Sequence, residues 1–200
     1  MNNKKEHVIR SKRSLLALLA LFPLLSTWAY AEIGIPTIPP GRFFKWDIAP
    51  KGSRIEVDFI VTEYRVYEFD IGFGNKNDPD AKDQSWRDDD KNWQFISGGR
   101  DKLNNGMYPH PSVVVPVHIK VEKLLNVSAA PALVTEQTID TESRYAGGNL
   151  VMRRIIHQKL RPGKYRVTAI TTRESSLPDS LGTYLRIGFY AKASILNDDE

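Results

Sequence analysis

The chain has 200 residues, contains no cysteine, and carries 28 basic against 24 acidic residues. The absence of cysteine excludes disulfide bonds and thiolate metal sites. The segment from Met1 to Ala31 holds five of the basic residues and one acidic residue, so the remainder has 28 − 5 = 23 basic and 24 − 1 = 23 acidic residues. Because this remainder is neutral, its charge gives no support to nucleic-acid binding.

The segment from Met1 to Ala31 has the pattern of an export signal. Basic residues are followed by an apolar run from Leu15 to Leu25, and Ala29 and Ala31 put small side chains where a signal peptidase cleaves. We therefore expect cleavage before Glu32 and a periplasmic location. The apolar run is shorter than the roughly 20 residues of a comfortable membrane span, and an uncleaved anchor is the alternative. Because no cysteine follows the leader, a lipid-anchored lipoprotein is excluded.

The chain from Glu32 to Glu200 is long enough for one domain with a core of its own. Residues 32–42 contain three prolines and predict an extended lead-in, and residues 43–200 form the single domain. Alternating apolar and polar residues predict about eight strands in that domain. The predicted strands are Phe43–Ile48, Ile55–Val61, Tyr67–Phe73, Val113–Glu122, Leu133–Ile139, Met152–Leu160, Tyr165–Thr172 and Tyr184–Tyr190.

The connections between strands are less well defined than the strands. The short spacer around Thr62 and Glu63 is consistent with a hairpin or with a bent strand that crosses between sheets, and we favour the hairpin. Pro116 lacks an N–H donor, which predicts an edge position or a bulge for its strand. The stretch from Thr141 to Asn149 is a predicted loop.

The best-defined turn is the stretch from Leu160 to Tyr165. Pro162 fixes one backbone angle, Gly163 supplies a conformation that other residues avoid, and the tyrosine can fold back so that its hydroxyl reaches an upstream backbone group. This is the tyrosine corner of antiparallel β-sandwiches. Together with the strands it predicts a mainly β fold, an antiparallel, immunoglobulin-like β-sandwich.

A polar insert from Asn75 to Pro111 interrupts the strands. Its tryptophans, Trp86 and Trp93, are spaced to share one face of a short helix from about Gln84 to Ile96. Asp83 can cap the start of this helix and a double glycine can end it. This is the one helix that we predict.

No catalytic constellation is visible in the sequence. The chain lacks a Gly-x-Ser-x-Gly motif and a nucleophilic cysteine, and its histidines after the leader are His110, His118 and His157. A solvated or cross-strand histidine is the ordinary explanation for His118 and His157. We therefore predict no catalytic residue and no enzymatic activity.

The insert also contains six aspartates within a short stretch. Oxygen-rich loops can hold calcium, but this spacing lacks the glycine and the distal glutamate of the twelve-residue calcium loop, and basic residues are interleaved. We expect a solvated acidic surface and no metal or cofactor. The aspartates are Asp78, Asp80, Asp83, Asp88, Asp89 and Asp90.

Five segments carry recognisable sheet and turn motifs: Ile55–Phe59, Tyr64–Phe73, Pro116–Val121, Thr138–Tyr145 with the double glycine after it, and the Leu160–Val167 corner. Together they resemble a bacterial family of exported single-domain β proteins that is catalogued as a domain of unknown function. The resemblance implies a shared fold. Members resemble the immunity-type partners of secreted antibacterial toxins, and the resemblance supplies no catalytic residues.

The insert combines carboxylates and aromatic side chains, a combination suited to docking into the basic cleft of a protein. We therefore expect an exported, non-enzymatic binding protein, an immunity-type factor that neutralises a periplasm-acting antibacterial effector by occluding it. The alternative is a β-sandwich that binds cell-envelope glycans or small molecules, with the two tryptophans as a stacking platform. The expected contact residues are Trp86, Asp88, Asp89, Asp90, Trp93 and Tyr108.

Overall fold

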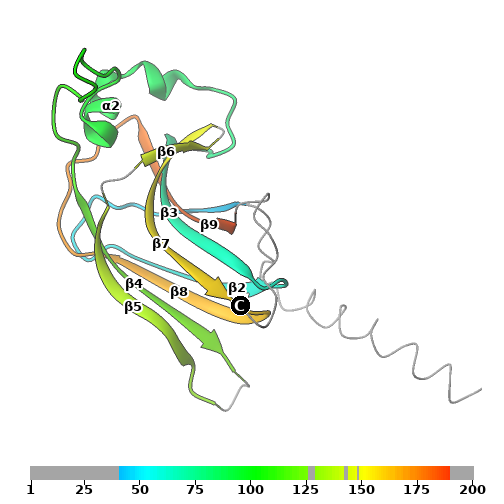
Figure 1. The fold of residues 1–200 in the computed structure, drawn as a ribbon. Coiled ribbons are helices and arrows are strands. Elements are labelled where there is room, and N and C mark those ends of the chain that lie inside the picture. The colour runs from blue at the N-terminus through cyan, green and yellow to red at the C-terminus, as the bar shows by residue number, and fades with distance from the viewer. Residues whose placement is uncertain (1–40, 126–128, 142–143, 148, 190–200) are drawn as a thin grey trace, which may run out of the picture. The chain divides into compact units, whose positions relative to one another are not determined.

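The computed structural model describes residues 41–125, 129–141, 144–147 and 149–189, so the predicted leader, most of the proline-rich lead-in and the tail lie outside the described residues. Two antiparallel sheets form a β-sandwich, as predicted (Figure 1). The four-stranded sheet has the order β2 (Arg54–Val61), β8 (Gly163–Thr171), β4 (Val115–Leu124) and β5 (Ala132–Thr141). The five-stranded sheet has the order β1 (Arg42–Lys45), β9 (Leu181–Phe189), β3 (Arg65–Asn75), β7 (Leu150–Leu160) and β6 (Arg144–Gly147).

The core lies between the two sheets and is built from the alternating apolar residues of the strands. Phe59 in β2 stacks on Tyr165 in β8, with ring centroids 5.7 Å apart, and meets Phe69 in β3 edge-on at 6.0 Å. Phe59 and Phe69 belong to opposite sheets and are fully buried. This aromatic group therefore holds one sheet on the other.

The predicted tyrosine corner is present. The hydroxyl of Tyr165 donates to the carbonyl of Arg161 at 2.7 Å, and the ring is buried. Gly163 has a φ of 156°, and a Cβ at this position would lie 2.9 Å from the side chain of Lys123. Glycine is therefore favoured here by the backbone conformation, since the flexible end of the lysine can move aside.

The predicted hairpin between the second and third strands is wrong. β2 pairs with β8 in one sheet, whereas β3 pairs with β7 and β9 in the other. The chain therefore crosses between the sheets within the short spacer, as in the alternative given above. The hydroxyl of Tyr67, which donates to the carbonyl of Glu63 at 3.3 Å, fastens this crossing from the β3 side.

Two further expectations about the sheets are corrected. β4 lies between β8 and β5, so the prediction of an edge strand around Pro116 is wrong. The proline is accommodated because it lies just beyond the last β4–β8 pair, Val117 and Thr171, so the donor that it lacks would only have extended the ladder to Thr172. The predicted loop from Thr141 to Asn149 contains β6, which pairs with the start of β7.

The predicted helix is broken into two. A 3₁₀ helix, η1 (Ser85–Asp88), is followed by α2 (Asp90–Ser97), and Asp89 between them is extended. The left-handed Gly98, with a φ of 81°, ends α2 as predicted. Figure 1 shows α2 at one end of the sandwich. Over the residues that the structure describes, no helix has the length and apolarity needed to cross a membrane.

Candidate functional site: the surface of the insert

The insert is fixed to the sandwich by a buried arginine. Arg153 lies in β7 and is fully buried. Its guanidinium donates to the carbonyls of Phe95 at 2.7 Å and Ile96 at 3.1 Å, which belong to the last turn of α2. It also donates to the carbonyls of Val113 and Thr141, next to β4 and at the end of β5. One side chain therefore ties α2 to both sheets.

The surroundings of Arg153 suit a positive charge. The carbonyls at the end of a helix lack partners within the helix, and the helix dipole places partial negative charge there. The guanidinium also lies over the rings of Phe73 and Phe95, at 5.3 and 5.9 Å from their centroids. The position of α2 relative to the sheets is therefore fixed by a charge-assisted contact that no sequence motif predicts.

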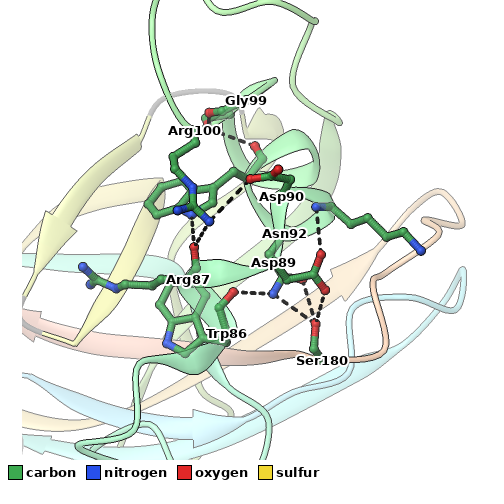
Figure 2. Close-up of polar contacts among 11 residues, drawn as sticks. Trp86, Arg87, Asp89, Asp90, Asn92, Gly99, Arg100 and Ser180 are labelled. Atoms are coloured by element: carbon green, nitrogen blue, oxygen red, sulfur yellow. Dashed lines mark hydrogen bonds and ion pairs between the residues drawn. The ribbon is translucent and has the colours of Figure 1, made fainter.

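A second polar contact holds the start of α2. The side-chain amide of Asn92 donates to the carbonyl of Trp86 at 2.6 Å and to the hydroxyl of Ser180 at 3.1 Å. That hydroxyl donates to the carboxylate of Asp89 at 2.8 Å, as Figure 2 shows. Ser180 directly precedes β9, so this contact joins the insert to the five-stranded sheet.

The carboxylate of Asp89 is already hydrogen-bonded within the protein. Its carboxylate accepts from the Ser180 hydroxyl and from the backbone N–H of Lys91, at 3.0 Å, as the N-cap of α2. These two donors, the hydroxyl first, lower the pKa of Asp89. Of the three neighbouring carboxylates expected to meet a partner, Asp89 therefore has a structural role.

The two tryptophans pack against each other. Trp86 is buried, Trp93 is half-buried, and their rings stack with centroids 6.2 Å apart. The indole N–H of Trp93 and the guanidinium of Arg100 each donate to the carbonyl of Arg87 at 2.7 Å (Figure 2). Both rings take part in the packing of the insert, and Trp86 offers no face to solvent.

Asp88 and Asp90 remain on the surface. Both are exposed, and the side chain of Asp90 is 89% exposed. Asp90 forms an ion pair with Arg100 at 3.4 Å, visible in Figure 2. The two carboxylates stand at a hollow of about 630 Å³. Its other lining residues are Gln94, Gly99, Arg100, Asp101, Lys102, Leu103, Pro109 and His110.

Two exposed apolar side chains stand beside this hollow. Leu103 is 51% exposed and Met107 is 65% exposed, and the N–H of Leu103 donates to the carbonyl of Met107 at 2.7 Å. Neither side chain was predicted as part of the site, although the Asn105–Gly106 pair between them is a turn signal. Tyr108 is half-buried, and Lys102 lies over its ring at 5.6 Å. We call the exposed group Asp88, Asp90, Arg100, Asp101, Lys102, Leu103 and Met107 the insert face.

The histidines have ordinary surroundings. His118 lies on β4 between the hydroxyl of Thr138, at 3.2 Å, and the carboxylate of Glu136, at 3.0 Å, as a cross-strand residue does. Within the described ranges, no three side chains of His, Asp or Glu converge as metal ligands.

The fold and this surface can be compared with known proteins. The chain matches the family described as a domain of unknown function, DUF5625, over residues 44–189. The chain belongs to the DUF5625 family. This confirms the predicted membership of a family of unknown function. The match covers all the strands of this DUF5625 chain except the first two residues of β1.

A protein of Sulfurospirillum deleyianum, known from its crystal structure, is similar to this DUF5625 chain. The two share 18% sequence identity with a TM-score of 0.60, and the match covers 77% of this chain and 99% of that one. At this identity the likeness shows a common fold and nothing of a common activity. No curated protein matches the chain.

Proposed function

We propose that this DUF5625 chain is an exported, non-enzymatic binding protein of the immunity type. It neutralises a periplasm-acting antibacterial effector by covering the effector's active site with the insert face. The export pattern from Met1 to Ala31 supports the location. The single observation that carries the proposal is the pair of exposed apolar side chains, Leu103 and Met107, on an insert fixed rigidly to the sandwich.

The insert face has the composition of a small interface. Tight protein contacts have an apolar centre that is fully desolvated on binding and a polar rim around it. Leu103 and Met107 supply such a centre, and the rim carries three carboxylates against two cations, one of which already pairs with Asp90. Since the net charge of the rim is small, the apolar pair contributes more to affinity than the carboxylates, which act mainly on the association rate.

The rigid attachment of the insert favours binding. Ordering a loop at an interface lowers affinity, and a surface that is already ordered avoids this loss. Arg153 fixes the end of α2 and Ser180 fixes its start. The partner that fits this face is a secreted protein with an apolar pocket in a cleft rimmed by basic residues.

The test uses two leucines of equal exposure. Leu103 and Leu125 are each 51% exposed, and only Leu103 belongs to the insert. The chain from Glu32 to Glu200 serves as bait in a periplasmic extract, and a captured toxin is then assayed for inhibition. We expect Leu103→Asp to abolish capture and inhibition and Leu125→Asp to leave both unchanged. Equal loss in both variants, or capture without inhibition, would contradict the proposal.

A second test addresses the carboxylates. Replacing Asp88 and Asp90 by alanine should lower the association rate and weaken its dependence on salt, because both side chains are exposed at the rim. Asp89 is left in place because it caps α2. Retention of the protein on glycan or peptidoglycan supports, with no captured toxin, would favour the ligand-binding alternative instead.

A further inference from the structure

The longest exposed edge of the sandwich is that of β5. This strand pairs with β4 on one side and, over the described ranges, with no strand on the other (Figure 1). Glu136, Gln137 and Thr138 at its middle are exposed. Edge strands of natural proteins are commonly shortened, or protected by lysine or proline. β1 and β6 have four residues each and β2, the other edge of the four-stranded sheet, has eight, whereas β5 has ten. β5 contains neither lysine nor proline, and its one irregularity leaves the stretch from Thr135 to Thr141 regular.

The free backbone groups of β5 can be identified from the register. The N–H of Thr172 donates to the carbonyl of Pro116 at 3.0 Å, so the polar backbone groups of Pro116 face β8. Because the residues of an antiparallel strand face alternate neighbours, Val117 and Ile119 face β5. They are opposite Ile139 and Gln137, whose N–H and C=O groups are therefore used by β4.

It follows that Glu136, Thr138 and Asp140 direct their N–H and C=O groups away from β4, toward solvent. A register shift at Val121 makes Val134 an extra residue in β5, so the regular run begins at Thr135. A strand placed here would find donors and acceptors already spaced for antiparallel pairing.

We infer that a second copy of this chain occupies this edge, with the two β5 strands antiparallel about a twofold axis at Gln137. The choice of register rests on charge. An axis at Glu136 would place Glu136 against its own copy, and an axis at Thr138 would place Glu136 against Asp140 of the other copy. Like charges directly opposite each other destabilise a sheet.

The axis at Gln137 avoids both clashes. It places Glu136 opposite Thr138 of the second copy, in a pair joined by backbone hydrogen bonds on each side of the axis. It also places Thr135 opposite Ile139, both β-branched and suited to a sheet. The two Gln137 side chains then face each other in a non-hydrogen-bonded pair, in which side chains approach most closely. The resulting dimer has one continuous eight-stranded sheet and leaves the insert faces unused.

The absence of native cysteine provides a direct test. In a non-hydrogen-bonded pair the Cα atoms are about 4.5 Å apart, within the range of a disulfide. Under mild oxidation Gln137→Cys should form a covalent dimer about tenfold or more faster than Thr172→Cys, an exposed position outside the edge, because pairing raises the local thiol concentration.

The register is tested with Glu136→Cys and Thr138→Cys. Each variant alone should crosslink slowly, and a mixture of the two should crosslink rapidly, because these positions face each other across the axis. Rapid crosslinking of Glu136→Cys alone would overturn the register. The uncrosslinked protein should show a dimer in sedimentation, and circular dichroism should confirm that each variant is folded.

A matched variant separates pairing from folding. Thr138→Pro removes an N–H that points away from β4, so the bonds between β4 and β5 remain and the monomer should fold. We expect this variant to sediment as a monomer and to suppress crosslinking when combined with Gln137→Cys. If the unmodified protein is monomeric at all concentrations and Gln137→Cys crosslinks no faster than Thr172→Cys, the inference is wrong.

Discussion

Replacing Arg153 by methionine should destabilise the whole protein, because this side chain joins α2 to both sheets. Methionine matches the apolar part of the arginine and cannot donate to the four carbonyls. The carbonyl of Phe95 keeps a hydrogen bond from the N–H of Val113. The carbonyl of Val113 can be hydrated by water, because this residue is partly exposed. The carbonyl of Thr141 keeps the N–H of Val115, its hydrogen-bonded partner in β4, whereas the carbonyl of the fully buried Ile96 loses the guanidinium.

The magnitude follows from the carbonyl of Ile96. A buried acceptor left without a donor costs about 1–3 kcal/mol. Removing a buried charge recovers part of this, because the guanidinium no longer has to be desolvated. We expect the free energy of unfolding to fall by about 2 kcal/mol, which lowers the melting temperature by about 4–8 °C for a domain of this size.

An exposed strand residue, Arg54 in β2, provides the control. Its side chain is 56% exposed and pairs with Glu56, which is 37% exposed, a contact worth about 0–1 kcal/mol. Urea denaturation is followed with two probes. Tryptophan fluorescence reports on the insert through Trp86 and Trp93, and circular dichroism reports on the whole domain. If Arg153→Met and Arg54→Met have the same urea midpoint, Arg153 is not the anchor described above. Arg153→Lys, which keeps the charge without the planar fork, should lie between them.

Three further predictions concern the insert and the corner. The stability that Asp89 gives α2 is fully present above the ordinary carboxyl pKa of about 3.9, and it is lost as the pH falls through the lower pKa of Asp89 in the folded state. Ser180→Ala should raise this folded-state pKa, which a carboxyl NMR titration measures. An unchanged pKa would contradict the contact between Ser180 and Asp89. Gly106→Ala, at a φ of 80° with no atom within 4 Å of the new Cβ, should cost only about 1–2 kcal/mol for the left-handed backbone. Gly98→Ala, whose Cβ would lie 1.6 Å from a carbonyl oxygen, should destabilise far more in urea denaturation, and equal midpoints would refute the steric argument. Tyr165→Phe, which loses a 2.7 Å hydrogen bond, should lower the free energy of unfolding by about 1 kcal/mol in the same assay, and no change would show that the hydroxyl is dispensable.

The strands and the corner could be predicted because their signals are local. Alternation requires only neighbouring residues, and the tyrosine corner is contained within a few positions. Strand pairing depends on residues far apart in the chain, and the spacer after β2 is compatible with either a hairpin or a crossing. The prediction of a hairpin therefore lacked the deciding information, which is that β2 pairs with β8.

The candidate site was only partly predictable for a similar reason. The three consecutive aspartates cannot be told apart in the sequence. In the structure, the break between η1 and α2 turns Asp89 toward Ser180 and leaves Asp88 and Asp90 exposed to solvent. Helical spacing correctly predicted that the two tryptophans lie together. The buried role of Arg153 could not be predicted from the sequence, because a charged residue in a strand ordinarily faces solvent.

The position of β9 has a consequence for how the chain folds. This strand lies between β1 and β3, and Arg42 in β1 is opposite Ile187 in β9, so the first and the last described strands are neighbours. Pairing between such distant segments requires a large loop to close, which slows folding. The five-stranded sheet cannot be completed while β9 is still being synthesised. Until then β1 and the side of β3 that pairs with β9 lack their partner strand. The five-stranded sheet of this topology therefore acquires its final pairing only once the last described strand is available.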